Sequence, residues 1–246
     1  MTQDLHRQEE YHDGTFHVYD YDRCRRHLAG FYGYLARIQN QVLIERLQGR
    51  TVLDAGAGAG TLVRHLQENG IACTGIDPCP EQVEFAREVN GVEILPRSVY
   101  ETGFSPGEFD ALVLRESVSH LEFDRVLSEA DRLGIRQIMI LDSNLILPLR
   151  VLRRLTGHVE KNVRSFEYYV ELSKKAGFDS VEFGFQDVIA FPLSGGLYYP
   201  CVVPNIPAMW QSLATVDHVL NACVGCLHIQ RYMCWQYWID ARKSGA

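Results

Sequence analysis

Hydrophobic positions along the chain follow two periodicities that alternate. Short, nearly continuous apolar runs are typical of buried strands, whereas apolar residues three or four positions apart are typical of helices with one buried face. Runs of the first kind predict strands at 51–55, 71–78, 92–96, 109–117, 135–143, 179–191 and 231–240. Runs of the second kind predict one or two helices within 22–48 and further helices at 61–70, 79–90, 121–134 and 165–177. Strands that alternate with helices in this way predict a doubly wound α/β sheet.

The turn between the first predicted strand and the next helix is rich in glycine. Residues 52–66 read VLDAGAGAGTLVRHL, with Gly56, Gly58 and Gly60 at every second position. Such a turn lets a ligand approach the main chain while the amides at the start of the helix point toward it. A dinucleotide fingerprint, G-x-G-x-x-G, would need glycine at position 61, where the chain has Thr61. A tight turn without a ligand is the alternative, and the acids beside the turn distinguish the two.

Two acids stand at the ends of the first two predicted strands. Asp54 ends the first strand, where it would repel a pyrophosphate and attract a cationic amino group. Asp77 ends the second strand, where an acid can accept hydrogen bonds from ribose hydroxyls. The pair therefore favours a ligand that has an ammonium group and a ribose but no phosphate.

LDAGAGAG at 53–60 and GIDP at 75–78 together resemble the class I S-adenosylmethionine-dependent methyltransferases, whose first motif reads acid-x-Gly-x-Gly-x-Gly. The resemblance covers about residues 45–190 and the terminal strand. It implies a Rossmann-like seven-stranded, mostly parallel sheet with an antiparallel last strand, and S-adenosyl-L-methionine as the cofactor. It further implies that the glycine loop with Asp54 holds the methionine part, that Asp77 holds the ribose and that Pro78 packs on the adenine.

The adenine side and the end of the fourth strand carry the remaining candidates that the resemblance implies. Ser98 stands where the family usually has an aspartate beside the adenine amine, so we expect this contact to be weaker or to come from the Val99 backbone and Glu101. In FDALVLRESVSHLE, Arg115 lies with the cofactor-binding residues at the strand end and His120 lies in the following turn. His120 is the candidate general base, because histidine titrates near neutrality. A histidine that only holds the loop is the alternative.

Composition narrows the partners. The 246 residues include 24 Lys and Arg against 31 Asp and Glu, a net charge of -7, and the basic residues are scattered. We therefore expect no nucleic-acid partner, because phosphate binding needs a basic face. The polar start and the absence of a long apolar stretch predict a cytoplasmic protein without membrane contact. Seven cysteines, an odd number, indicate reduced thiols.

Cysteine and histidine side chains near the end of the chain could in principle bind zinc. Cys223, Cys226, His228 and Cys234 have the right side chains, but the second pair lacks finger spacing. We interpret VDHVLNACVGCLHIQ as an apolar helix in which Cys223 and Cys226 fill the core, and we expect no metal.

Segments outside the common motifs should select the substrate. We expect an N-terminal helical lid at 1–48, a core at 49–191 and 231–246, and an inserted cap at 192–230. The cap brings Tyr198, Tyr199 and Trp210, which suit the wall of an apolar pocket; a second small core or a dimer surface is the alternative. Residues 144–162 form an amphipathic segment with Arg150, Arg153 and Arg154 that is typical of a solvated surface helix, contact with an anionic or membrane-borne substrate being the alternative.

These features predict methyl transfer to a small, partly apolar metabolite. Because the sulfonium is already a strong electrophile, the protein has to align the acceptor and exclude water, and it needs a base only if the acceptor carries a proton. The sequence does not separate oxygen, nitrogen and carbon acceptors. A non-catalytic cofactor-binding protein of the same fold is the main alternative, and a nicotinamide-dependent oxidoreductase is the other.

Overall fold

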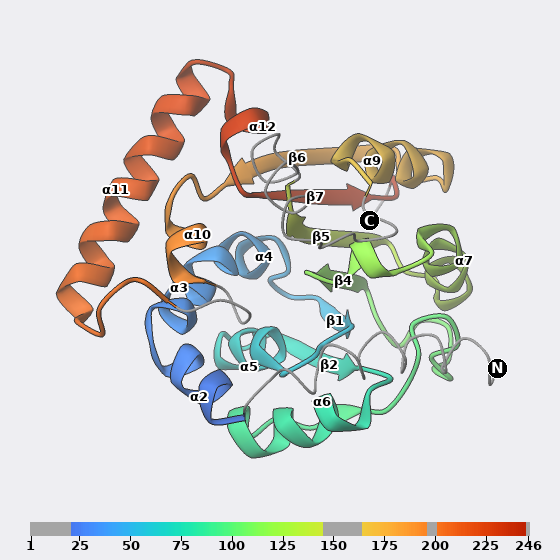
Figure 1. Cartoon of the computed structure of the whole chain (residues 1–246). Coiled ribbons are helices and arrows are strands. Elements are labelled where there is room, and N and C mark those ends of the chain that lie inside the picture. Colours follow the sequence, from blue (N-terminus) through green and yellow to red (C-terminus); the bar gives the residue numbers. More distant parts are fainter. Residues whose placement is uncertain (1–20, 145–163, 196–200, 245–246) are drawn as a thin grey trace.

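A single mixed sheet forms the centre of the molecule (Figure 1). The computed structural model describes residues 21–144, 164–195 and 201–244. The seven strands have the order β3-β2-β1-β4-β5-β7-β6; β7 runs antiparallel to both of its neighbours, and the other pairs are parallel. The strands are β1 Thr51–Ala55, β2 Ala72–Ile76, β3 Ile94–Leu95, β4 Ala111–Arg115, β5 Gln137–Ser143, β6 Ser180–Gln186 and β7 Gln236–Arg242. The predicted doubly wound, seven-stranded sheet with a reversed last strand is confirmed.

Helices cover both faces of the sheet. The helical region predicted at 22–48 is three helices, which are interrupted at Gly30 and Asn40. The helices are α2 Tyr21–Ala29, α3 Phe31–Gln39, α4 Gln41–Arg46, α5 Thr61–Glu68, α6 Pro80–Phe85, α7 Phe123–Leu133, α9 Phe166–Lys175, α10 Ala190–Ser194, α11 Pro207–Cys226 and α12 Gln230–Met233. A π-helical turn, Ala86–Asn90, continues α6, and a 3-10 turn, Val118–His120, follows β4. None of the described helices has the length and apolar character that a membrane span requires.

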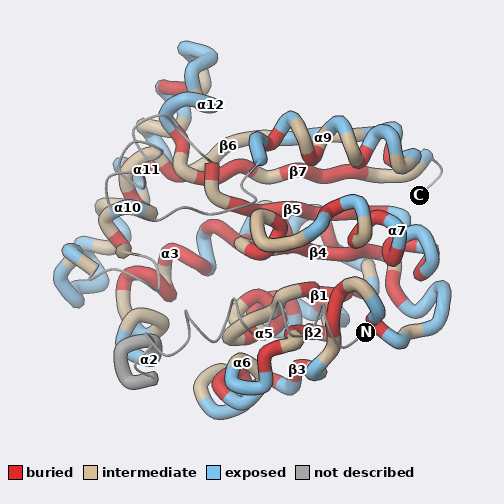
Figure 2. Tube along the Cα trace, turned by 45° about the vertical axis from the view of Figure 1, so that its right-hand side comes forward, coloured by how far each residue is buried: buried red, intermediate tan, exposed pale blue. Residues whose placement is uncertain are grey.

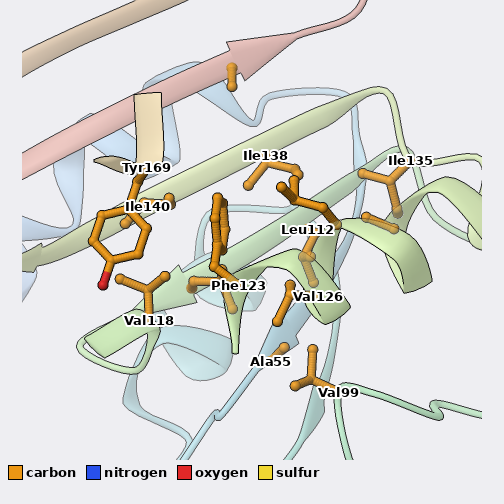
Figure 3. Packing of buried hydrophobic residues seen from close by; sticks show 14 of the residues in the cluster. Ala55, Val99, Leu112, Val118, Phe123, Val126, Ile135, Ile138, Ile140 and Tyr169 are labelled. Atoms are coloured by element: carbon orange, nitrogen blue, oxygen red, sulfur yellow. The ribbon is translucent and has the colours of Figure 1, made fainter. Parts of the chain in front are cut away.

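The face of the sheet under α7 and α9 holds the largest hydrophobic cluster (Figure 3). Phe123 of α7 and Tyr169 of α9 pack against Ile138 and Ile140 of β5. The rings of Phe123 and Tyr169 meet edge to face, with centroids 5.2 Å apart. A fully buried side chain of this kind contributes about 1.5–3 kcal/mol. This cluster fixes the strands whose ends carry the site.

The opposite face packs against α4 and α5. Leu43 of α4 and Leu62 of α5 share a buried cluster with Val52 of β1 and Val113 of β4. Buried positions run along the central strands β1, β4, β5 and β7 and the inward sides of the helices, while much of β6, α11 and α12 is exposed (Figure 2). The α4/α5 face is important for the site, because Asp54 lies on it, as shown below.

The two strands next to the last connection are shorter than predicted. β6 ends at Gln186, not at residue 191, because Asp187 adopts a positive φ of 64° and α10 follows. β7 begins at Gln236, not at residue 231, because residues 230–233 form the short helix α12. The amide of Cys234 donates to the Gln230 carbonyl and closes that turn. Both segments are apolar enough to be predicted as strands, and apolar pattern alone does not show where they turn.

The described part of 192–230 packs largely on the N-terminal helices. Phe31 and Leu35 of α3 form a small cluster with Ala190 of α10, and Trp210 of α11 packs against it. The rings of Tyr34 and Trp210 lie 5.9 Å apart. The domain limits at 48, 191 and 231 stay predictions. Tyr198, Tyr199, the basic segment with Arg150, Arg153 and Arg154, and the first 20 residues lie outside the described residues.

Candidate functional site

The glycine loop between β1 and α5 has left-handed backbone at all three glycines, but for different reasons. The φ angles are 77° at Gly56, 51° at Gly58 and 70° at Gly60. A Cβ at Gly56 would lie 2.8 Å from the Cβ of Ser117, and one at Gly60 would lie 2.4 Å from Val92 Cγ2. A Cβ at Gly58 would have its nearest neighbour, the side chain of Gln82, at 3.7 Å. Packing within the protein therefore accounts for Gly56 and Gly60, whereas a Cβ at Gly58 would make only ordinary contact with its neighbours among the described residues.

Asp54, at the carboxyl end of β1, carries a buried carboxylate. The residue is 1% exposed, and neither carboxylate oxygen has a hydrogen-bond partner among the described residues. Burial raises the pKa of Asp54 to about 7; the positive charge of Arg115 opposes this and the negative charge of Asp77 adds to it. An unpaired carboxylate is costly to bury unless a cation or a proton compensates it. This position therefore fits an ammonium group.

Asp77, directly after β2, joins the glycine loop to the second strand. Its Oδ2 accepts a hydrogen bond from the Gly58 amide at 2.9 Å, and its Oδ1 accepts one from the Cys79 amide, also at 2.9 Å. Each carboxylate oxygen has two lone pairs and can accept more than one hydrogen bond. The structure thus brings Asp54, Gly58 and Asp77 together at the carboxyl ends of β1 and β2, where ligands bind in open α/β sheets.

The residues expected on the adenine side lie beyond the ends of β2 and β3. Pro78 is partly exposed. The Ser98 hydroxyl accepts a hydrogen bond from the Tyr100 amide at 3.3 Å, and Ser98 also forms an isolated bridge with Glu101. Val99 packs into the main hydrophobic cluster, near Ala55 (Figure 3). Their contact with adenine stays a prediction.

Arg115 shares a face of the sheet with Asp54. Asp54 is in parallel register with Val113, and Arg115 follows Val113 by two residues, so all three side chains project from the α4/α5 face. The Arg115 Nε donates to Asn40 Oδ1 at 2.7 Å, and the Asn40 amide contacts His65 Nδ1 at 2.8 Å. Neither Asn40 nor His65 was among the residues predicted for the site from the sequence. An asparagine between two helical segments was the available signal, but the neighbouring sequence does not show which residues its side chain contacts.

The segment after β4 is fixed by several polar contacts. Glu116 has a φ of 53°, and its carboxylate accepts hydrogen bonds from Ser143 and Gln236, on β5 and β7. His120 ends the 3-10 turn that follows and is partly exposed. The amide of Ser119 donates to the buried carboxylate of Asp142 at 3.3 Å. His120 thus lies on an anchored turn at the carboxyl end of β4, and its role in proton transfer stays a prediction.

A second pair of buried acids lies where β6 ends. One oxygen of Asp217, on α11, accepts the backbone amides of Val188, Ile189 and Ala190 at 3.0, 2.6 and 2.8 Å. Asp187 accepts a hydrogen bond from the buried side chain of Gln39 at 2.6 Å, while burial and the nearby Asp217 charge raise the Asp187 pKa to about 7. The sequence analysis missed this pair, because the two acids are 30 residues apart along the chain (217 against 187) and each stands in an apolar segment.

Two further features lie away from these residues. Cys223 and Cys226 are exposed on α11, so their expected role as core residues is wrong; Cys234 is buried and donates to Asn221. No group of three possible metal ligands occurs within the described ranges.

A cavity of about 520 Å³ lies beside Thr51 and Ala72, at the amino ends of β1 and β2, on the opposite edge of the sheet.

Comparisons with known proteins agree with this arrangement. Residues 53–137 match the family described as "Methyltransferase domain". A ubiquinone biosynthesis O-methyltransferase of Paramagnetospirillum magneticum is 35% identical over 101 residues, 39% of this chain and 39% of that protein. One of Methylocella silvestris is 40% identical over 81 residues, 30% and 31% of the two chains. The matched region thus spans less than half the length of these curated relatives.

Solved structures share the fold. A SAM-dependent methyltransferase from Archaeoglobus fulgidus has a TM-score of 0.62 at 19% identity, covering 85% of this chain and 94% of that one. Magnesium protoporphyrin IX methyltransferase from Synechocystis PCC 6803, with bound SAH, has a TM-score of 0.58 at 16% identity, covering 98% and 100%. At such identities the likeness concerns the fold alone.

Proposed function

The chain carries a class I S-adenosylmethionine-dependent methyltransferase domain, and from this premise we propose that it transfers the cofactor's methyl group to a small, partly apolar acceptor. The observation that carries the proposal is the carboxylate of Asp54, which is buried without a hydrogen-bond partner among the described residues. It lies beside a loop in which no close neighbour among the described residues excludes a side chain at Gly58, and in which Asp77 accepts hydrogen bonds from two backbone amides. An ammonium group and a ribose would satisfy these two acids.

The residues fit the cofactor as follows. Asp54 would hold the ammonium group, the backbone at Gly58 would let the methionine part approach, and Asp77 would accept hydrogen bonds from the ribose. Pro78, Ser98 and Val99 would line the adenine side. When bound, S-adenosylmethionine supplies a methyl group on a positively charged sulfur, which is already reactive toward nucleophiles. The work left to the protein is to orient the acceptor and to keep water out.

We place the acceptor beyond the ends of β4 and β6. His120 would remove a proton from a hydroxyl acceptor there, and its turn is held by the buried Asp142. The cap at 192–230 would close this side, because Asp217 of α11 accepts the three amides that follow Asp187. Figure 1 shows α10 and α11 beside the end of β6.

The two curated relatives are named as O-methyltransferases of ubiquinone biosynthesis, so a phenolic hydroxyl is the first acceptor to test. Nitrogen and carbon acceptors are the alternatives. A dimer surface is the alternative role for 192–230, and the exposure of Met209, Val216 and Val219 on α11, 43%, 50% and 54%, is the observation that favours it.

The test uses the full chain, methyl-labelled S-adenosylmethionine and a panel of catechols, amines and carbon nucleophiles, together with a metabolite extract. We expect one product whose mass increases by one labelled methyl group. Cofactor binding without any labelled product in the panel or the extract would favour the non-catalytic alternative. Tighter binding of NAD than of S-adenosylhomocysteine would favour the oxidoreductase.

A further inference from the structure

The break between α3 and α4 places two buried amide side chains next to each other in the sequence. Gln39 and Asn40 are 1% and 0% exposed. Gln39 reaches toward the end of β6, where it donates to Asp187 at 2.6 Å. Asn40 reaches toward the end of β4, where its Oδ1 accepts from Arg115 Nε at 2.7 Å. The two amides thus contact different strand ends, and only Asn40 contacts Arg115.

We infer that Asn40 is a positioning residue, which holds Arg115 near Asp54 so that the two present paired opposite charges to the methionine end of the cofactor. The inference rests on the proposed function and extends it to a residue outside the family motifs. The methionine end has one ammonium and one carboxylate group. A buried acid and a guanidinium on the same face of the sheet match that pair of charges.

The contacts of Asn40 leave it little freedom. Its amide contacts His65 Nδ1 at 2.8 Å, which requires His65 to accept through that nitrogen and to be neutral. Burial and the nearby Arg37 and Arg115 charges lower the pKa of His65 to about 4, so it is neutral above pH 6. With its amide used in this way, the oxygen of Asn40 is directed at Arg115. The orientation of Arg115 is thus set from α4 and α5 together.

Arg115 has more than one acidic neighbour, so its orientation determines which carboxylate its charge stabilises most. Its charge acts on Asp54 and also on Asp187 at the other side of the site. Asp54 in turn faces Asp77 beyond β2 and the Cys73 thiol on β2; burial raises the pKa of that thiol, which stays uncharged. Arg115 is the cation that favours the ionised form of Asp54. If Asn40 no longer holds Arg115, Asp54 should bind a proton more readily and hold an ammonium group less well.

The test compares two probes in calorimetric titrations from pH 6 to 8.5. S-adenosylhomocysteine carries the amino-acid end, whereas 5′-methylthioadenosine shares the nucleoside but lacks that end. For Asn40→Ala we expect affinity for S-adenosylhomocysteine to fall about tenfold at pH 7, because a smaller fraction of Asp54 is ionised. The affinity should recover partly as the pH rises, because Asp54 then loses its proton. Affinity for 5′-methylthioadenosine should stay at the wild-type value.

The matched control is Gln39→Ala, which removes an equally buried amide from the same helix break but breaks the bond to Asp187. It should leave the ratio of the two affinities unchanged. In the Arg115→Met background, Asn40→Ala should have no further effect on that ratio. Should Asn40→Ala fail to fold, Asn40→Ser, whose hydroxyl is too short to reach Arg115, takes its place.

Equal losses for both probes, or an unchanged ratio in Asn40→Ala, would overturn the inference while leaving the proposed function intact. An additive effect of Asn40→Ala in the Arg115→Met background would also overturn it. Failure of the wild type to bind either probe would instead remove the proposed function itself.

Discussion

Gly58 and Gly60 allow the most direct separation of ligand binding from folding. Both have left-handed backbone, so an alanine at either position costs about 1–2 kcal/mol in strain. At Gly60 the new Cβ would also lie 2.4 Å from Val92 Cγ2 and 3.1 Å from Ala86 Cβ, which adds about 1–3 kcal/mol for overpacking. At Gly58 the nearest atom is 3.7 Å away, so strain is the whole cost.

Thermal unfolding and calorimetry should therefore rank the two variants in opposite order. Without ligand, Gly58→Ala should lower Tm by roughly 2–8 °C, because about 1 kcal/mol shifts Tm by about 2–4 °C at this chain length. Gly60→Ala should lower Tm by more. For S-adenosylhomocysteine, Gly58→Ala should lose about tenfold or more in affinity, because its Cβ occupies the space left for the ligand.

The reasoning would be refuted if Gly58→Ala bound S-adenosylhomocysteine as tightly as the wild type. It would equally be refuted if Gly58→Ala were as unstable as Gly60→Ala, since the open space at Gly58 would then not exist.

Three further predictions concern single side chains. Asp77→Ala should weaken cofactor binding by about 1–3 kcal/mol, measured by calorimetry, through loss of the ribose acceptor and of the bond to the Gly58 amide. His120→Ala should reduce turnover by about 10²–10⁴-fold with little change in cofactor affinity, and this reduction should be smaller at high pH. If Tm and cofactor affinity fell together instead, His120 would have the structural role of holding the turn. Asp54→Asn should change the pH dependence of both stability and binding. Because the folded pKa of about 7 lies above the usual 3.8, the native state holds a proton that the unfolded state releases, so Asp54 makes the ligand-free protein less stable as pH rises from about 4 to about 7. Affinity for the ammonium-bearing probe should instead rise across that window. Asp54→Asn should remove the part of the fall in stability with pH that Asp54 contributes, measured by urea unfolding. It should also remove most of the rise in affinity with pH. If both pH dependences stayed unchanged, the assignment would be refuted.

The sequence was sufficient to predict the frame of the fold and the position of two acids, Asp54 and Asp77, at the ends of its first two strands. Asp54 and Asp77 each end a strongly apolar strand, and parallel strands bring their carboxyl ends to one edge of the sheet, so local pattern alone placed them together. The glycine-rich turn was predicted from the sequence, and its role in cofactor binding stays a prediction. Its three glycines could not be told apart, because the neighbours that exclude side chains at Gly56 and Gly60 are Ser117 and Val92, both distant in the sequence.

What the sequence could not supply are contacts between distant polar residues. Asn40 looks like an ordinary helix-end residue until Arg115 and His65 are placed around it. The end of β6 depends on Asp217, which lies about 30 residues later in the sequence. Its carboxylate accepts hydrogen bonds from the three backbone amides that follow Asp187, and the extended backbone ends there. An apolar periodicity carries no information on such partners, which is why the strand was predicted to continue to residue 191.

The central claim is that the glycine loop, Asp54 and Asp77 hold S-adenosylmethionine, and a calorimetric titration of the full chain with S-adenosylhomocysteine and with NAD tests it most directly. The account predicts saturable binding of S-adenosylhomocysteine at one site per chain and no measurable heat with NAD at the same concentrations. Binding of NAD in preference, or no binding of S-adenosylhomocysteine at all, would contradict it.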